Sequence, residues 1–234
     1  MFAEIARTLL AEETLPATLT KICSLAVATI EGCDHAGITV VQTRKLSTEG
    51  ASDDVPELVD GIQYESGEGP CLDAIRDHEV FQTDDLGKES RWPKFAQRAV
   101  DETGVHSMLC FRLFAESDTM GALNLYSKRT DAFDEEAREV GAVFAAHAAV
   151  AMSSAKDHQQ MEDAIRSRDM IGQAKGILMT RQGITEQEAF ELLKRASQRL
   201  NIKLRDVAEA VSTGKAPGAE GEAPGSHSRA TPPG

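Results

Sequence analysis

Two hydrophobic periods alternate along the first two-thirds of the chain. Apolar residues recur at helical spacing over 19–30 and predict a helix that Gly32 ends. Residues 35–42 (HAGITVVQ) are rich in β-branched side chains and predict a strand, with residues 45–51 as its hairpin partner. An amphipathic segment at 2–10 stands ahead of these elements.

Shorter stretches follow, separated by glycine and proline. A Gly-rich loop, YESGEGP at 64–70, stands between two short predicted helices. Ser90 is expected to cap a later helix that Gly104 ends. In chain order the predicted elements are helices at 55–63, 71–76 and 92–102, and strands at 79–83, 106–114 and 120–127. This order predicts an α+β fold in which helices pack on one face of an antiparallel sheet.

A long helical pattern begins at Asp134 and continues past residue 158. Its seam of mainly small residues steps by four and three: Ala137, Gly141, Phe144, Ala148, Ala151, Ala155 and His158. The seam favours a signalling helix that dimerises. The alternative is that the first turns only cover the sheet as its last helix.

The last third predicts three helices. The first ends near Arg181, with Gly183 as its stop, and Thr185 caps the second in a capping box with Glu188. Asn201 suits the exit of the second helix. Ala174 and Gly176 are expected to let the second helix pack closely. The predicted core comprises Ile171, Ala174, Ile177, Leu178, Ala189, Phe190, Leu192, Leu193, Ala196, Leu200, Leu204, Val207, Ala208 and Val211.

Composition excludes several classes of protein. No apolar run approaches the roughly 18 residues of a membrane span, and the N-terminus lacks the features of a secretory signal, so we expect a cytoplasmic protein. The four cysteines form no CxxC pair and have no zinc-site spacing, which favours reduced, buried thiols and no metal site. Residues 213–234 are rich in Gly, Pro and Ser and predict a disordered tail.

Charge is distributed unevenly along the chain. The net charge is −13, but residues 1–161 carry 14 basic and 28 acidic side chains, whereas residues 162–211 carry 9 and 8. The acidity therefore belongs to the first two-thirds, and the last third is weakly basic. The acidic first two-thirds would repel nucleic acid, so that any nucleic acid would bind the last third instead.

Motifs in the first two-thirds resemble those of GAF domains. They are GEGPCLDAIRDHEVFQTDDL and GALNLYSKRTDAFDEEA, with RWPKFAQRAVDETGVHSMLCFRLF between them. The resemblance implies a GAF-like sensor over residues 5–150, continued by a helical linker at 151–161. GAF domains bind small molecules of several kinds or none, so the cofactor is unknown. His35, His78 and His106 are isolated, which disfavours haem ligation, and Trp92 is expected to cover the core.

The Gly-rich loop is the candidate ligand site of this sensor. Gly67 and Gly69 permit backbone conformations that are closed to other residues, and Cys71 opens the helix whose N-terminus is able to hold an anion. The alternative is that the glycines only turn the chain. Some GAF-fold proteins reduce methionine sulfoxide with clustered cysteines, which leaves a catalytic protein as a further alternative. No catalytic constellation is recognisable, and we expect no enzyme.

Residues 162–212 resemble ANTAR domains over the family's whole length. IGQAKGILM, then EAF, LL and A, then LRDVAEAV occur in order with the family's spacing. The resemblance implies an antiterminator that binds stem-loops in mRNA leaders and prevents a terminator hairpin from forming. Two stem-loops require two such domains, which fits a homodimer. No strand ends in a phosphoacceptor Asp, so a signal at the GAF part is the expected input.

The candidate RNA-binding residues are the cations left outside the predicted core. Arg168 and Lys175 share one helix face, and so do Arg195 and Arg199, so these groups are expected to converge on one RNA loop. With no exposed aromatic, base stacking is not expected. The alternatives are a solvated, salt-bridged surface and a DNA-binding regulator. The full set is Arg168, Lys175, Arg181, Lys194, Arg195, Arg199, Lys203 and Arg205.

Overall fold

A computed structural model describes residues 14–42, 45–77, 80–115 and 118–214. The chain forms two compact units, Met1–Asp157 and His158–Gly234. The amphipathic segment expected at 2–10 and the tail expected to be disordered lie outside the described residues, apart from the first two residues of the tail. In the described part of the chain, no helix is both long and apolar enough to cross a membrane.

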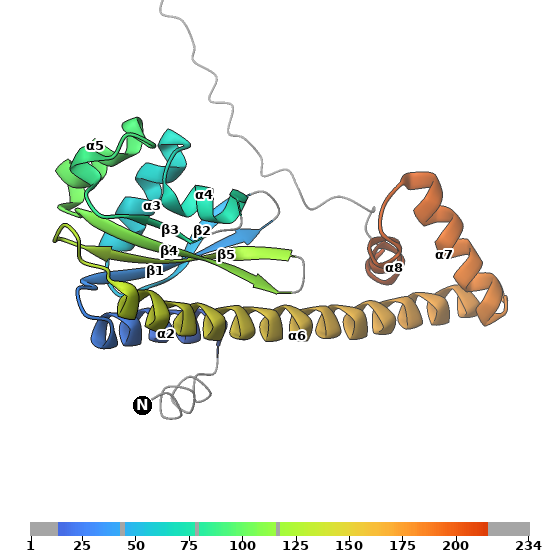
Figure 1. Cartoon of the computed structure of the whole chain (residues 1–234). Helices are drawn as coiled ribbons and strands as arrows, with labels where there is room; N and C mark the ends of the chain where they lie inside the picture. The colour runs from blue at the N-terminus through green and yellow to red at the C-terminus, as the bar shows by residue number, and fades with distance from the viewer. Residues whose placement is uncertain (1–13, 43–44, 78–79, 116–117, 215–234) are drawn as a thin grey trace, which may run out of the picture. The chain divides into compact units, whose positions relative to one another are not determined.

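A five-stranded antiparallel sheet forms the middle of the first unit (Figure 1). Its strands lie in the order β2-β1-β5-β4-β3, so the hairpin β1–β2 joins the later strands through β5. The hairpin occupies the residues predicted for it. In chain order the strands are β1 His35–Gln42, β2 Lys45–Ala51, β3 Phe81–Thr83, β4 Ser107–Ala115 and β5 Asp118–Ser127.

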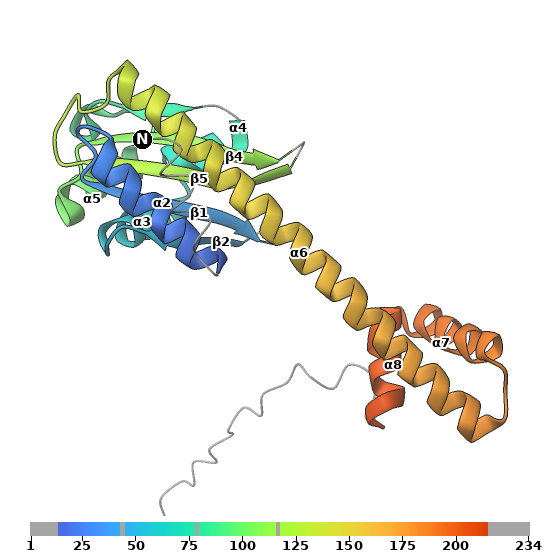
Figure 2. The ribbon, with the colours of Figure 1, turned by 90° about the horizontal axis from the view of Figure 1, so that it is seen from below.

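Helices cover both faces of this sheet, which corrects the expectation that they pack on one face. α2 (Leu15–Thr29) and the start of α6 (Glu135–Gln182) lie side by side on one face (Figure 2). α3 (Val55–Ser66), α4 (Pro70–Asp77) and α5 (Pro93–Thr103) cover the other face (Figure 1). The strands are apolar on both sides and therefore need two covers.

The small-residue seam of α6 faces the sheet of its own unit. Ala137, Phe144 and Ala148 are buried there, and a Cβ at Gly141 would lie 2.5 Å from the Phe111 ring. Small side chains let the helix lie close to the strands. Its first turns thus cover the sheet, as the alternative held, and the seam over 137–148 is wrong as a dimer contact.

Two local predictions in the first unit are also corrected. α3 continues to Ser66, so Tyr64 is helical and the Gly-rich loop shrinks to three residues. Ser90 does not cap α5, because the N-cap is Trp92, which makes no side-chain cap bond. Pro93 in the first turn has no N–H to satisfy, so the missing side-chain cap costs little.

The second unit comprises the end of α6, α7 (Glu186–Leu200) and α8 (Leu204–Thr213). The capping box is confirmed, because Thr185 and Glu188 exchange both of its hydrogen bonds. Gly183 and Asn201 have the positive φ angles of helix ends, +67° and +52°. A short η1 turn, Leu86–Lys88, completes the elements of the first unit.

The core of the second unit is smaller than predicted. Its buried members are Ala174, Ala189, Leu193, Val207 and Ala208. Several other predicted members are only partly buried against them: Ile171, Leu178, Ala196, Leu204 and Val211. Phe190, Leu192 and Leu200 were expected in the core but are exposed. Gly176 is exposed as well. Outside its own helix turn, a Cβ there would meet no atom of the described residues within 4 Å, so Gly176 serves no close packing among them.

Candidate functional site

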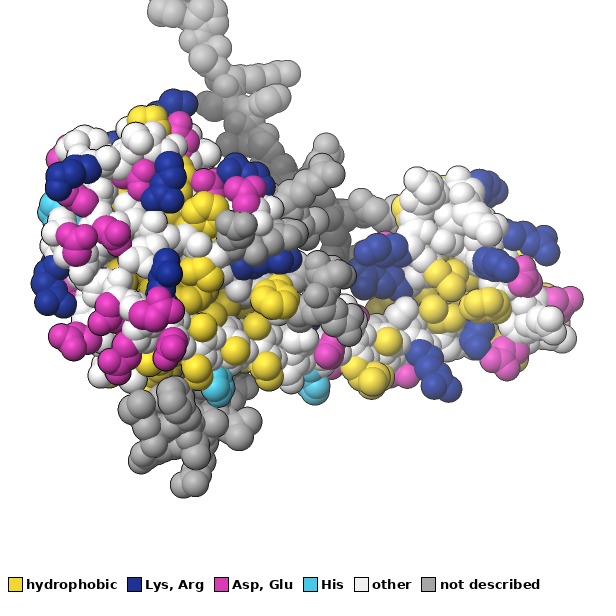
Figure 3. Space-filling model, in the orientation of Figure 1, with side chains coloured by type: hydrophobic (Ala, Val, Ile, Leu, Met, Phe, Trp, Pro, Cys, Tyr) yellow, Lys and Arg dark blue, Asp and Glu magenta, His cyan; other side chains and the backbone are white. Residues whose placement is uncertain are grey.

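The cations predicted to bind RNA all lie on the second unit. Three stand on α6, three on α7, and Lys203 and Arg205 stand at the N-cap and first turn of α8. Dark blue side chains surround a hydrophobic patch on the face of this unit seen in Figure 3. The helices therefore present the basic residues outward, around a small core.

Three of the eight cations have acidic partners. Lys175 of α6 donates to Glu186 of α7 at 2.5 Å, and its side chain is only 22% exposed. This contact lowers the pKa of Glu186. Lys194 lies 3.9 Å from Glu191, and Arg205 lies 3.3 Å from Asp206. Lys175 is therefore a link between two helices as well as a surface charge.

The other five cations are exposed and have no ion pair or hydrogen-bonded side-chain partner within residues 158–214. They are Arg168, Arg181, Arg195, Arg199 and Lys203. The charge of a guanidinium without a nearby carboxylate is not offset by an anion, and its fork of donors is free for a ligand. These residues are the ones that an anionic ligand meets without displacing an internal partner.

The cations form two groups on different sides of α7. Arg195 follows Glu186 by nine residues, about two and a half helical turns, so it projects from the side opposite Glu186 and Lys175. Arg199 lies one turn beyond Arg195, beside the short α7–α8 connection that leads to Lys203. The two groups therefore project from different sides of α7, and their convergence on one RNA loop stays a prediction.

In the first unit, the Gly-rich loop is held by the side chain of Gln63. Gly67 ends α3 with φ +69°, and Gly69 has φ +144°, where a Cβ would overlap the Gln63 amide. The backbone N–H of Cys71 donates to Gln63 Oε1 at 3.0 Å. Both glycines thus shape the turn, and the amide at the start of α4 already has an acceptor.

Cys71 itself is fully buried, and its thiol contacts Thr39 Oγ1 at 3.4 Å. Burial, reinforced by the nearby Asp60, raises its pKa to about 12. A thiol with such a pKa is a poor nucleophile at neutral pH. The other three cysteines are buried and free as well, as the composition predicted.

Sequence reasoning missed a buried carboxylate network around Asp60. Asp60 of α3 is 0% exposed, and six side-chain donors surround its two oxygens. Burial raises the pKa of this carboxyl, whereas the donors lower it. The donors are Gln63 (3.1 Å), Asn124 (3.3 Å) and Tyr126 (2.7 Å) on Oδ1, and Thr39 (3.0 Å), Thr48 (2.8 Å) and Tyr64 (3.4 Å) on Oδ2.

The other candidate residues of this unit have internal roles. Trp92 is buried, as predicted, and donates from Nε1 to Asp73 at 2.7 Å. His35 contacts Asp53 at 2.7 Å, and His106 precedes β4 instead of lying on it. His78 lies outside the described residues. The part of the chain that the structure describes holds no group of three metal-ligating side chains.

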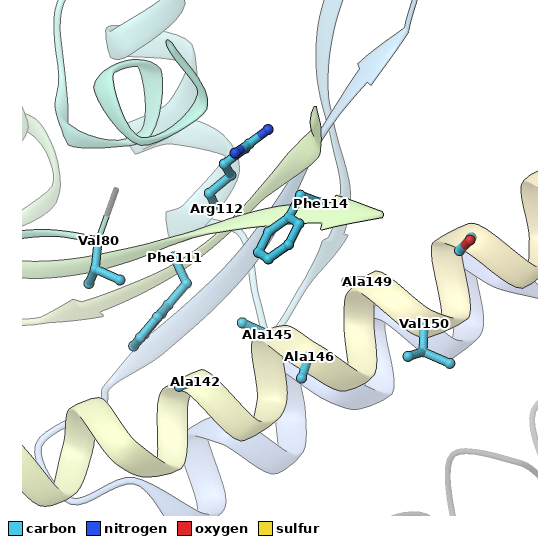
Figure 4. A pocket seen from close by; sticks show the side chains of 10 residues that line it. Val80, Phe111, Arg112, Phe114, Ala142, Ala145, Ala146, Ala149 and Val150 are labelled. Carbon is cyan, nitrogen blue, oxygen red and sulfur yellow. The ribbon is translucent and has the colours of Figure 1, made fainter. Parts of the chain in front are cut away.

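A groove of about 530 Å³ runs between β4 and α6 in the first unit (Figure 4). Ala142, Ala146 and Val150 form its helical wall, and Val80 and Phe114 line the strand side. Val150 is 70% exposed and Phe114 is 56% exposed, so this wall leaves apolar area in solvent. This face of α6 differs from the predicted seam, whose residues at 137–148 are buried on the sheet, whereas His158 at its end is exposed.

Family models match both parts of the chain. A GAF domain model matches residues 12–153, and an ANTAR domain model matches residues 159–211. Among curated proteins, no sequence matches this chain.

Solved structures resemble the chain in fold. The GAF domain of an Acinetobacter phosphoenolpyruvate-protein phosphotransferase has a TM-score of 0.52 at 15% identity, covering 68% of this chain and 94% of that chain. Bacteriophytochrome RpBphP3 from R. palustris has a TM-score of 0.56 at 14% identity, and the match covers 82% of this chain and 45% of that chain. The reduced form of fRMsr of Staphylococcus aureus has a TM-score of 0.50 at 13% identity, and the match covers 64% of this chain and 91% of that chain. At such identities, the similarity concerns the fold alone.

Proposed function

The chain belongs to the GAF domain family and carries an ANTAR domain, which makes it a regulator with a sensing domain, and from this premise we propose an RNA-binding transcription antiterminator. The ANTAR domain binds stem-loops in mRNA leaders, and a signal received by the GAF domain regulates that binding. The protein acts in the cytoplasm, where the nascent transcript is.

The observation that carries this proposal is the set of exposed cations on the second unit that lack partners. Arg168, Arg181, Arg195, Arg199 and Lys203 have no acidic partner within residues 158–214. Because phosphate contacts supply most of the non-specific affinity for nucleic acid, free arginines on a compact helical unit suit an RNA ligand. The acidic sensor disfavours contact elsewhere.

The proposed protein is a homodimer in which α6 of a second copy occupies the groove between β4 and α6. The support is the exposed apolar wall at Val80, Phe114 and Val150, and the small residues Ala142 and Ala146, which allow a second helix to approach closely. Val150→Asp is expected to reduce dimerisation in sedimentation equilibrium. Gln97→Glu places a similar charge on the exposed surface of α5, on the other face of the sheet, and is expected to leave dimerisation unchanged.

The signal in this proposal is a small molecule that acts on the GAF domain. The loop at Gly67, Gly69 and Cys71 remains the predicted contact. A ligand that binds the Cys71 amide there must displace the Gln63 side chain. Differential scanning fluorimetry of the full chain against nucleotides and other anionic metabolites tests this. Gln63→Leu frees the Cys71 amide, so a ligand-induced shift that grows in Gln63→Leu but not in Gln97→Leu, on the exposed surface, supports the loop.

A binding titration tests the function directly. Full-length protein is titrated into a leader RNA with two stem-loops and into duplex DNA of equal length, at low and at physiological salt. Preference for the RNA, with steep salt dependence, supports the proposal, and equal or tighter binding to the duplex would favour a DNA-binding regulator instead. Sequencing the RNA that co-purifies from cells then identifies the transcripts.

A further inference from the structure

Three residues, 201–203, connect α7 to α8 in the second unit (Figure 1). Ser197 of α7 holds this connection. Its carbonyl accepts from the N–H groups of Asn201 and Ile202, the latter at 3.2 Å, and its Oγ donates to the Ile202 carbonyl at 2.6 Å. The Ile202 side chain packs against the core of the unit. The backbone of the connection is therefore fixed by the chain itself.

Asn201 differs from other left-handed helix ends in the described part of the chain. Asn201 has φ +52°, a conformation that costs more for a residue with a Cβ than for glycine. After α3, α5, α6 and α8, the chain instead places a glycine with φ between +67° and +71°: Gly67, Gly104, Gly183 and Gly214. Asparagine visits this conformation because its side chain can bond locally, but the exposed Asn201 side chain makes no hydrogen bond to a described residue. The turn therefore leaves its amide unexplained.

The residues on both sides of Asn201 carry charges that the described chain does not neutralise. Arg199 and Lys203 are exposed and have no ion pair within residues 158–214. They are four positions apart, so their Cα atoms are separated by at most about 14 Å, with Asn201 midway along the chain. Arg195, one turn before Arg199 on α7, is exposed and unpaired as well. A free amide thus stands between free cations.

Lys203 is an unusual residue for its position. It is the N-cap of α8 and makes no side-chain cap bond. Ser, Thr, Asp and Asn are favoured at an N-cap, and a cation there opposes the helix dipole. No hydrogen bond or ion pair of its side chain with a described residue offsets this cost. The position is therefore better explained by an anionic ligand than by the stability of α8.

The chemistry of a free amide among cations matches one kind of nucleotide. An asparagine side chain offers a donor and an acceptor side by side. Adenine presents the complementary pair, its N6 amino group and its N7 acceptor, and asparagine binds both at once. Base edges of RNA are accessible in single-stranded loops, whereas the major groove of the stem is too narrow for side chains. The connection therefore fits an unpaired adenine with its flanking phosphates.

Resting on the RNA-binding function proposed above, we propose that Asn201 binds the edge of an unpaired adenine in the RNA loop, while Arg199 and Lys203 contact the phosphates on either side of it. Phosphate contacts position a protein on its nucleic acid, and base contacts give sequence specificity. Asn201 is then the residue that selects the loop. Glycine at this position would form the same turn but would not distinguish one base from another.

The test compares wild type with Asn201→Gly in the full-length protein. Glycine keeps the left-handed helix end and removes only the amide. Gln198→Ala is the matched control, because Gln198 is an exposed amide three residues earlier that makes no hydrogen bond to a described residue. The probes are a hairpin RNA with an adenine-only loop and the same hairpin with a uracil-only loop. In further versions, purine, which lacks the 6-amino group, replaces one loop adenine at a time.

Wild type is expected to bind the adenine loop about tenfold more tightly than the uracil loop, the factor that one bidentate base contact supplies. Asn201→Gly should bind both loops equally, with an unchanged salt slope because the amide carries no charge. One of the purine replacements should weaken wild type and leave Asn201→Gly unaffected. Gln198→Ala should behave as wild type. The proposal is overturned if wild type shows no preference for adenine, or if Asn201→Gly keeps that preference.

The same titrations distinguish the failure of this inference from the failure of the function. Wild-type protein that binds neither hairpin at low salt removes the RNA-binding function itself. Equal binding of both hairpins with a steep salt slope keeps the function and removes the base contact. Thermal denaturation checks the fold, and Asn201→Gly should retain the wild-type Tm because glycine adopts φ +52° without steric cost. A lower Tm with an unchanged loop preference would assign the amide to the turn.

Discussion

Arginine side chains have opposite roles in the two units. In the first unit, Arg91 forms a two-atom contact with Glu89 and lies 4.3 Å over Trp92, and Arg98 bonds to both Glu65 and Glu102. In the second unit, most arginines have no partner within residues 158–214. The first unit uses its charges to hold its own structure. The second unit leaves its arginines available to a partner. The net charge of the chain does not reveal this difference.

The two units also differ in the polar groups that their cores contain. The first unit buries a carboxylate among six donors, whereas the fully buried residues of the second unit are Ala, Leu and Val. Buried polar groups are stable only when every partner is in place, so the first core depends on the position of many side chains. The second depends on a few apolar contacts. Four predictions test this comparison, from the largest expected effect to the smallest.

Replacing Asp60 tests the buried network. Asp60→Ala leaves several buried donors without an acceptor and is expected to lower the free energy of unfolding of the first unit by about 3–5 kcal/mol. Trp92, the only tryptophan, reports on this unit in urea titrations. Asp101→Ala, at an exposed residue, is the control and should change stability by about 0.5 kcal/mol or less. Equal effects of the two variants would contradict the role of the network.

Replacing Leu193 tests the second core. Leu193 is 2% exposed and packs with the buried residues Ala174, Val207 and Ala208. Leu193→Ala is expected to cost about 2–4 kcal/mol and to reduce helical circular dichroism at 222 nm, as the second unit loses its structure. Trp92 fluorescence should keep the wild-type transition. A matching shift of that transition would show that the two units unfold together.

The ion pair of Glu89 and Arg91 predicts a pH effect confined to the first unit. Hydrogen bonds from Arg91 lower the pKa of Glu89 from 4.5 to about 2. The stabilisation is therefore present above pH 4.5 and is lost as the pH falls toward 2. Glu89→Gln is expected to lower stability by about 1–2 kcal/mol near neutrality, since Arg91 is half exposed, and to match wild type in acid. A constant difference at all pH values would exclude this origin.

Cation substitutions test the availability of charge in the second unit. Arg195→Ala is expected to lower RNA affinity severalfold and to reduce the slope against log salt by about 0.7–0.9, the value for one phosphate contact. Lys175→Ala should change the slope less, because Glu186 neutralises Lys175. Glu186→Gln should free that lysine and raise affinity about twofold to threefold. Equal slopes in wild type and all three variants would place the RNA contact elsewhere.

Local hydrogen bonds and backbone conformations made much of the fold predictable from sequence. The hairpin of β1 and β2, the capping box at Thr185 and the helix ends at Gly183 and Asn201 depend on residues a few positions apart. The family motifs extend over many positions and identify both domains without any coordinates. Reduced, buried cysteines were also predictable, because the sequence contains no paired spacing.

Contacts between distant parts of the chain required the tertiary structure. Asp60 and Tyr126 are 66 residues apart, and Lys175 meets Glu186 only because two helices turn back on each other. The spacing of apolar residues identified one apolar stripe on α7 and one on α6. It does not indicate how many residues of each stripe are buried by a neighbouring element. The narrow core of the second unit leaves Phe190 outside, and the sheet covers the seam of α6. The sequence by itself therefore determined the elements and their families, whereas packing decided which side chains remain for a ligand.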